Sequence, residues 1–224
     1  MRGKLIVIEG TDCSGKETQS NKLLDRLKEN NYKIEKFYFP KYDSPTGKIV
    51  GGPYLGKSYI CDGWFSEGAS NVDPKVASLY YAADRKYNID EIKAALDNGI
   101  NVILDRYTYS NMAHQGGKIL NANERLEMYN FIEKLEFDLL KLPQADIGIF
   151  LHMPYEWSNK LKEGRLEKGD QHEQDENHLR NAEKAYIEIS EKYGFKKIEC
   201  VSNDTIKSID EINNEIYNYV IKCL

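Results

Sequence analysis

Short apolar runs alternate with longer amphipathic segments along the whole chain. Five mostly apolar runs have the length of buried strands: residues 4–9, 34–39, 101–104, 145–152 and 197–201. Apolar positions recur at helical spacing in the segments 16–30, 74–87, 90–97, 122–140, 155–166, 176–193 and 208–221. This alternation predicts an α/β fold in three layers, with a central parallel sheet of about five strands and helices on both faces.

Length and composition favour one globular domain. The chain has 224 residues, of which 41% are hydrophobic and 30% charged. That length suffices for a well-buried core, and we find no internal repeat or low-complexity linker, so we expect a single domain over residues 1–224. No apolar stretch approaches the roughly 18 residues of a membrane span, and nothing resembles a signal peptide. We therefore expect no membrane partner.

Charge and cysteine content indicate which partners and which cell compartment to expect. The net charge of −5 argues against general binding of nucleic acid, which needs a basic face. Cys13, Cys61, Cys200 and Cys223 form neither a CxxC pair nor a metal-like spacing. We therefore expect a protein of the reducing cytoplasm without a nucleic-acid partner.

The first predicted strand runs into GTDCSGKET at residues 10–18, directly before a predicted helix. A glycine, four residues and then Gly-Lys is the P-loop spacing that wraps backbone N–H groups around phosphate oxygens. Where this motif has Ser or Thr to hold Mg²⁺, the chain has Glu17, so either Glu17 binds the metal or it turns away and Thr18 or water takes over. The residues predicted to bind ATP are Gly10, Cys13, Ser14, Gly15, Lys16, Glu17 and Thr18.

The third predicted strand ends in Asp105-Arg106, and the carboxyl ends of parallel strands meet at the edge that carries the P-loop. Asp105 has the position of the second carboxylate with which P-loop enzymes bind Mg²⁺; the alternative is a helix N-cap. A cation directly after the metal ligand suits a second, incoming phosphate, and we assign that role to Arg106.

Several segments follow one another at compatible spacing over nearly the whole chain. They are EGTDCSGKETQ (9–19), FP (39–40), YAADR (81–85), DRY (105–107), SNMAHQG (110–116) and a late charged segment. Together they resemble the thymidylate kinase family, which phosphorylates dTMP to dTDP with ATP. The resemblance implies a P-loop fold, ATP and dTMP as partners, Mg²⁺ as cofactor and a homodimer.

The resemblance also implies roles for individual residues. Asp12 would accept a hydrogen bond from the sugar 3′-hydroxyl, Tyr81 would stack on thymine, and Arg85 would donate to a thymine carbonyl. Lys16, Asp105, Arg106 and Arg165 would form the catalytic set. The residues implied to bind dTMP are Asp12, Phe39, Tyr81, Arg85, Arg106, Ser110, Asn111 and Gln115. Alternatively, Tyr81 is a core aromatic, Asp84-Arg85 a surface pair and His114 a packing residue.

Residues 161–177 are charged and resemble the lid that closes over ATP in this family; the alternative is a solvated loop. The P-loop lacks an arginine, so Arg165 becomes the candidate for the catalytic arginine of the lid. The family commonly has an arginine after Phe39-Pro40, where this chain has Lys41 and Tyr42. The stretch 51–72 is longer than in compact relatives, and we expect it either to cover the acceptor site or to shape a dimer contact.

Two other functions stay open. A deoxynucleoside kinase would transfer phosphate to a hydroxyl and would need a carboxylate base, with less use for Arg106. A nucleotide-binding regulator that has lost turnover through Glu17 would leave Lys16, Asp105 and Arg106 idle. We favour the first function, phosphorylation of dTMP.

Overall fold

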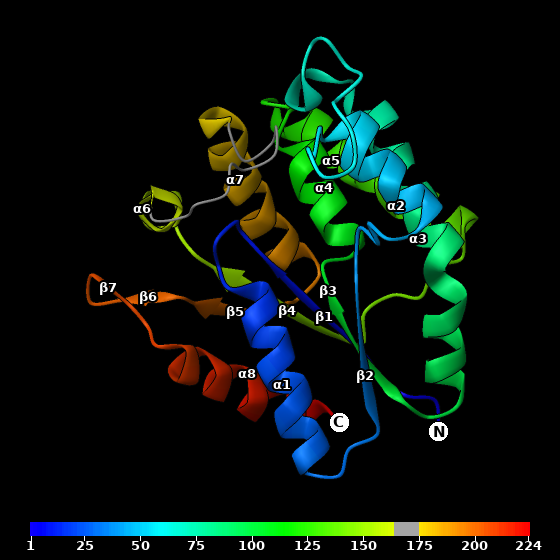
Figure 1. The fold of residues 1–224 in the computed structure, drawn as a ribbon. Coiled ribbons are helices and arrows are strands. Elements are labelled where there is room, and N and C mark those ends of the chain that lie inside the picture. The colour runs from blue at the N-terminus through cyan, green and yellow to red at the C-terminus, as the bar shows by residue number, and fades with distance from the viewer. Residues whose placement is uncertain (164–174) are drawn as a thin grey trace.

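The computed structural model describes residues 1–163 and 175–224 (Figure 1). In these residues the central sheet has five strands, all parallel, in the order β2-β3-β1-β4-β5. The strands are β1 (Leu5–Gly10), β2 (Ile34–Tyr38), β3 (Asn101–Asp105), β4 (Ile147–His152) and β5 (Lys196–Glu199). The predicted α/β fold with a parallel sheet of about five strands is confirmed.

Helices connect the strands and cover both faces of the sheet. The α-helices are α1 (Lys16–Glu29), α2 (Pro45–Ile49), α3 (Pro74–Asp97), α4 (Thr108–Gly116), α5 (Ala122–Glu133), α6 (Tyr155–Glu163), α7 (Glu176–Lys192) and α8 (Ile209–Cys223). Two π-helical segments, Val50–Tyr54 and Lys134–Leu139, follow α2 and α5, and a 3₁₀ turn spans Ala69–Asn71. A small antiparallel ribbon pairs β6 (Val201–Ser202) with β7 (Thr205–Ile206).

Alternate side chains of β1 enter two separate cores. Leu5 and Val7 pack with α3, α4, α5 and α7, whereas Ile6 and Ile8 pack with α1 and α8, which lie side by side on the opposite face (Figure 1). All four strand residues are fully buried, as a strand in the middle of a three-layer fold requires. No helix among the described residues is long and apolar enough to cross a bilayer.

Three predicted helices differ from the structure. Segments 74–87 and 90–97 form one helix, α3, because no glycine or proline interrupts them and the buried Ile89 and Ile92 continue its apolar face. The segment 122–140 begins as α5 but ends as a π-helix. The sequence missed α4, which is buried on almost every side and therefore has no polar face to reveal its period.

The long stretch after β2 forms a small core of its own beside α3. Val50, Tyr54 and Val72 form a separate small core with neighbouring aromatic rings. Lys118, just beyond α4, donates hydrogen bonds from Nζ to the carbonyls of Ala69 and Val72, each at 2.9 Å, and burial lowers the pKa of this lysine to about 8. These contacts hold the stretch against the main core.

Candidate active site

The phosphate loop between β1 and α1 has the backbone geometry of an anion cradle. Cys13 and Gly15 have positive φ angles of 59° and 76°, as in loops whose N–H groups converge on an anion. Gly10 leaves no room for a side chain, because an added Cβ would lie 2.5 Å from Ser14 Oγ and 2.8 Å from the Leu151 carbonyl oxygen. The buried Ser14 hydroxyl lies against Gly10 and has no hydrogen-bond partner among the described residues.

Lys16 begins α1, and its ammonium lies against the loop itself. Nζ donates to the carbonyl oxygens of Gly10 at 3.0 Å and Thr11 at 2.8 Å. Burial, and then the nearby charge of Arg106, lower the pKa of Lys16 to about 8. Anionic oxygens are stronger acceptors than carbonyls, so a bound triphosphate would replace these two contacts.

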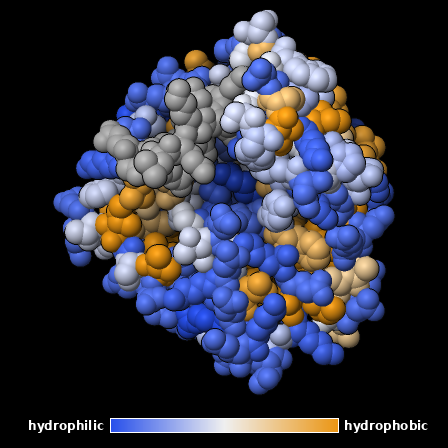
Figure 2. Space-filling model, viewed as in Figure 1, coloured by the Kyte–Doolittle hydropathy of each residue, from blue (hydrophilic) through white to orange (hydrophobic). Residues whose placement is uncertain are grey.

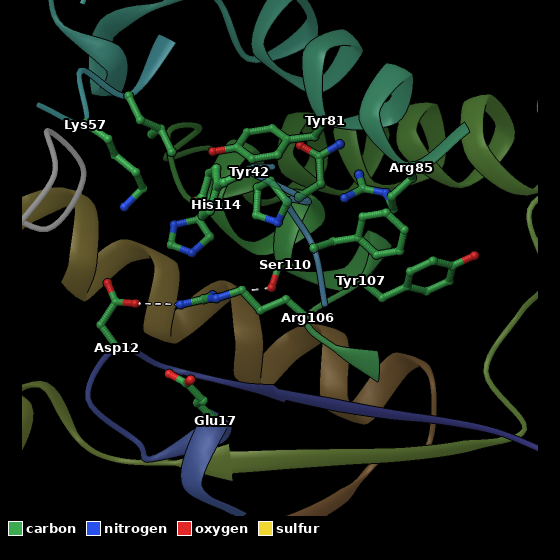
Figure 3. A pocket seen from close by; sticks show the side chains of 14 residues that line it. Asp12, Glu17, Tyr42, Lys57, Tyr81, Arg85, Arg106, Tyr107, Ser110 and His114 are labelled. Atoms are coloured by element: carbon green, nitrogen blue, oxygen red, sulfur yellow. Dashed lines mark hydrogen bonds and ion pairs between the residues drawn. The ribbon is translucent and has the colours of Figure 1, made fainter. Parts of the chain in front are cut away.

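Two carboxylates predicted to bind Mg²⁺ line the same cavity of about 460 Å³ beside the loop. Asp105 ends β3 and accepts a hydrogen bond from Ser20 Oγ at 3.4 Å, while Tyr107, not Asp105, is the N-cap of α4. Glu17 is exposed in the first turn of α1 and lines this cavity; Figure 3, which draws the neighbouring pocket, shows its carboxylate pointing toward that pocket. Thr18 lines this cavity as well.

Mg²⁺ is often held by one or two carboxylates together with phosphate oxygens and waters. Asp105 and Glu17 fit that donor set. No group of three or more His, Cys, Asp or Glu side chains suited to a metal occurs in the described ranges.

Arg106 lies between the loop and α4. Its φ angle of 66° falls in the left-handed region, which residues other than glycine rarely occupy and which recurs at functional sites. The guanidinium donates to Asp12 at 2.9 Å and to Ser110 Oγ at 3.4 Å (Figure 3), and also to the Tyr186 hydroxyl at 3.2 Å. It is the cation that a second phosphate would meet in front of the phosphate loop.

Glu9, near the end of β1, binds the residues that follow Arg106 in the chain. Its carboxylate accepts hydrogen bonds from the backbone N–H groups of Tyr107 at 2.8 Å and Ser110 at 3.1 Å, and from the Ser110 hydroxyl. Glu9 thereby satisfies donors at the N-terminus of α4, which has no side-chain cap of its own. Burial raises the pKa of Glu9.

Tyr81 and Arg85, one turn apart on α3, form the other end of the acceptor cavity. Tyr81 packs edge-on against Tyr54, with ring centroids 5.7 Å apart. Arg85 is 2% exposed and donates from Nε and Nη2 to the carboxylate of Glu136. The alternative that Asp84-Arg85 is a surface pair is wrong, because Asp84 is also buried and accepts from the backbone N–H of Lys41 at 2.9 Å.

Asn111 of α4 lies beside Arg85 at the same end. Its Nδ2 donates to Glu136 Oε1 at 3.1 Å and to the Ser78 carbonyl at 3.3 Å. Its Oδ1 is buried and has no partner within the described residues. Arg85 and Asn111 both line the acceptor cavity, so a guanidinium and an amide lie next to each other at this end.

The acceptor cavity of about 340 Å³ adjoins the cavity beside the phosphate loop. The residues that line both are Asp12, Glu17, Phe39, Pro40, Tyr42 and Arg106. Figure 2 shows a hydrophilic hollow near the middle of the face viewed in Figure 1. Two cavities that adjoin in this way can hold two phosphorylated ligands with their phosphates facing each other.

The remaining predicted residues divide into three groups. Phe39 and Ser110 line the acceptor cavity, whereas Gln115 is fully buried outside its walls, with an amide that has no partner among the described residues. Arg165 and most of the predicted lid lie outside the described residues. His114, for which a packing or solvent-facing position was the alternative, lines the acceptor cavity and stacks on His178, with centroids 5.3 Å apart.

The cation expected after Phe39-Pro40 is displaced. Lys41 Nζ donates to Glu91 at 3.3 Å and does not line either large cavity. Lys57, from the long stretch 51–72, lines the acceptor cavity instead. The stretch therefore covers the acceptor site, which was one of its two expected roles.

Sequence reasoning missed several residues that build the site: Glu9, Asp84, Glu136 and Tyr186. Glu136 left one local signal, since it continues the four-residue spacing of the buried Met128 and Ile132. A carboxylate on an apolar helix face needs a buried partner.

A model of the family described as Thymidylate kinase matches residues 8–216. The chain is 30% identical to the thymidylate kinase of Plasmodium falciparum (isolate 3D7) over 220 residues, 96% of this chain and 93% of that protein. It is 33% identical to the thymidylate kinase of Prochlorococcus marinus (strain NATL2A) over 225 residues, 96% and 97% of the two chains. A solved thymidylate kinase from Candida albicans shares the fold, with a TM-score of 0.74, 24% identity and coverage of 99% and 92%. With its P-loop, acceptor cavity and family match over nearly the full length, the chain belongs to the thymidylate kinase family.

Proposed function

We propose that the protein transfers the γ-phosphoryl group of ATP to dTMP, giving dTDP and ADP. The observation that carries this proposal is that the two cavities adjoin, with Arg106 and Asp12 lining both. An oxygen of the dTMP phosphate forms the new bond to the γ-phosphorus while the bond to the β,γ-bridging oxygen breaks. Phosphate monoesters are largely ionised at neutral pH, so the attacking oxygen needs no general base.

Lys16 and Arg106 supply the positive charge at the point of transfer. Lys16 leaves the loop carbonyls and follows the β- and γ-phosphates, and Arg106 exchanges Asp12 for the acceptor phosphate. Because the transferred group carries its negative charge on peripheral oxygens, catalysis consists mainly of positioning and electrostatic stabilisation. Arg165 stays a predicted third cation.

Glu17 and Asp105 would hold Mg²⁺, which they fit as a carboxylate pair facing the phosphate cavity. The ion would neutralise charge on the phosphates when bound. Without an ion between them, the exposed Glu17 carboxylate and a triphosphate would repel each other.

Base recognition is supported by the donor and acceptor at the far end of the cavity. Arg85 has Nη1 left for a ligand after Glu136 has occupied Nε and Nη2, and it can donate to a thymine carbonyl. The Asn111 Oδ1 can accept from the neighbouring ring N–H. Cytosine presents an amino group and an unprotonated nitrogen at these two positions, so it is disfavoured.

The decisive experiment incubates the purified protein with ATP, Mg²⁺ and a panel of acceptors. We expect dTDP from dTMP and little product from thymidine. Equal turnover of thymidine would favour a deoxynucleoside kinase, and nucleotide binding without turnover of any acceptor would favour the regulator.

We further propose that the protein is a homodimer and that it is located in the cytoplasm. The location is supported by four cysteines that are all free thiols.

A further inference from the structure

Glu136 lies in the π-helical segment Lys134–Leu139 and is 51 residues from Arg85 in the sequence. It nevertheless binds the polar side chains at the end of the acceptor cavity where we place the base. Its side chain is 0% exposed. It is absent from the residues that line either large cavity, so it acts on a ligand only through its neighbours.

Three side chains donate to this one carboxylate. Arg85 reaches it with Nε and Nη2, Thr108 with its hydroxyl at 2.8 Å, and Asn111 with Nδ2 at 3.1 Å. Arg85 and Asn111 line the acceptor cavity, whereas Thr108 does not. Glu136 thus accepts hydrogen bonds from two polar side chains of the cavity wall and from one side chain behind them.

The carboxylate decides which way the Asn111 amide points. The reverse orientation would place Oδ1 against Glu136 and against the Ser78 carbonyl, so three acceptors would face one another without a proton between them. The observed orientation leaves Oδ1 as the buried atom without a partner among the described residues. That atom is the acceptor which a ring N–H of the base requires.

The carboxylate also fixes the arginine. Two parallel N–H···O contacts orient a planar guanidinium in a way that a single contact does not, and they leave Nη1 as its remaining donor. Glu136 therefore orients both the Arg85 donor and the Asn111 acceptor.

We propose that Glu136 is a positioning residue that gives the acceptor site its preference for a base edge with a carbonyl next to an N–H, by orienting Arg85 and Asn111 together. This inference rests on the proposed function, because it concerns the acceptor of that same reaction. It assigns base selection to a residue that never touches the base.

The test compares kcat/KM for dTMP and dCMP in Glu136→Gln. A neutral amide still fits the space, but it holds the guanidinium less firmly and can accept or donate toward Asn111, which frees that amide to turn. We expect the ratio of the two kcat/KM values to fall at least tenfold, mainly through a higher KM for dTMP. Circular dichroism melts establish which variants are folded.

Glu188→Gln is the matched control, because Glu188 also holds an arginine, Arg125, through two contacts at 2.9 and 2.6 Å away from the cavity. It should leave the ratio within twofold of the wild type. A similar loss of discrimination in Glu188→Gln would show that the effect is a general loss of packing and would overturn the proposal.

Thr108→Val is the second variant, in case Glu136→Gln does not fold. It removes one hydrogen bond to Glu136 without changing charge or volume much, and we expect a two- to fivefold fall in the ratio. An unchanged ratio in every folded variant of the pair overturns the proposal. Failure of the proposed function is distinguishable, because the wild-type protein would then not phosphorylate dTMP at all.

Discussion

The two ends of the acceptor cavity each contain an arginine paired with a carboxylate, but they hold it differently. Arg85 has a side chain 2% exposed and is bound twice by Glu136, which is 0% exposed. Arg106 has a side chain 26% exposed and meets Asp12 through one nitrogen at 2.9 Å. The ion pair at the base end is therefore closed to solvent, whereas the ion pair at the phosphate end is open to it.

This difference follows from what each end has to do. The base stays uncharged and unchanged throughout the reaction, so its partners can be fixed in advance and their desolvation is compensated within the protein. Phosphates arrive and leave with their charge, so the cations that meet them must change partners. Lys16 shows the same behaviour as Arg106, since it rests on two loop carbonyls.

The largest expected effect is on stability at the base end. Arg85→Ala leaves the Glu136 carboxylate buried without its cation, and we expect a loss of about 3–5 kcal/mol in the free energy of unfolding. Arg125→Ala should lose less, because solvent reaches its partner Glu188. Urea unfolding of both variants measures this, and equal losses would mean that Arg85 is not a closed pair.

At the phosphate end, Lys16→Met should lower kcat by about 10²–10³-fold, the scale of removing one donor to transition-state charge. Its stability should change little, because the lysine gives up contacts only to loop carbonyls. Steady-state kinetics at saturating ATP measure the effect. The affinity for dTMP, measured by calorimetry, should stay near the wild-type value; a large loss there would place Lys16 in the acceptor site instead.

Arg106→Ala should lower turnover with dTMP tenfold or more, the scale of one charge-assisted contact of roughly 1.5–3 kcal/mol. The ratio of kcat/KM values for dTMP and dCMP should stay constant, because the base end is left intact. Unaffected turnover would remove Arg106 from the acceptor phosphate, and a changed ratio would contradict the division into two ends.

Glu17→Gln has the smallest expected effect. If Glu17 binds Mg²⁺, its loss raises the Mg²⁺ concentration needed for half-maximal activity while the affinity for dTMP stays nearly unchanged. If it only favours the positive end of α1, about 0.3–1 kcal/mol of stability is lost and the Mg²⁺ midpoint does not move. Mg²⁺ titrations of Glu17→Gln and Glu17→Thr at fixed ATP distinguish the two roles, and an unchanged midpoint in both removes Glu17 from the metal site.

The phosphate end was largely readable from the sequence because its information is local. The P-loop residues are consecutive, and Asp105 and Arg106 directly follow an apolar strand whose position at the sheet edge follows from parallel topology. Five strands with their approximate bounds came from apolar runs, for the same reason. Local pattern suffices wherever neighbours in the chain are also neighbours in space.

The base end was decided by tertiary structure. Arg85 and Asn111 could be named from a family motif, but their partner Glu136 lies 51 and 25 residues away from them in the chain. Lys57 rather than Lys41 lines the cavity because of how the stretch 51–72 folds. The cost of burying a charge depends on which partner the fold brings to it. The sequence therefore predicted a phosphate site and its place at the sheet edge, while the packing of α3, α4 and the π-helical segment brought together the residues proposed to recognise the second ligand.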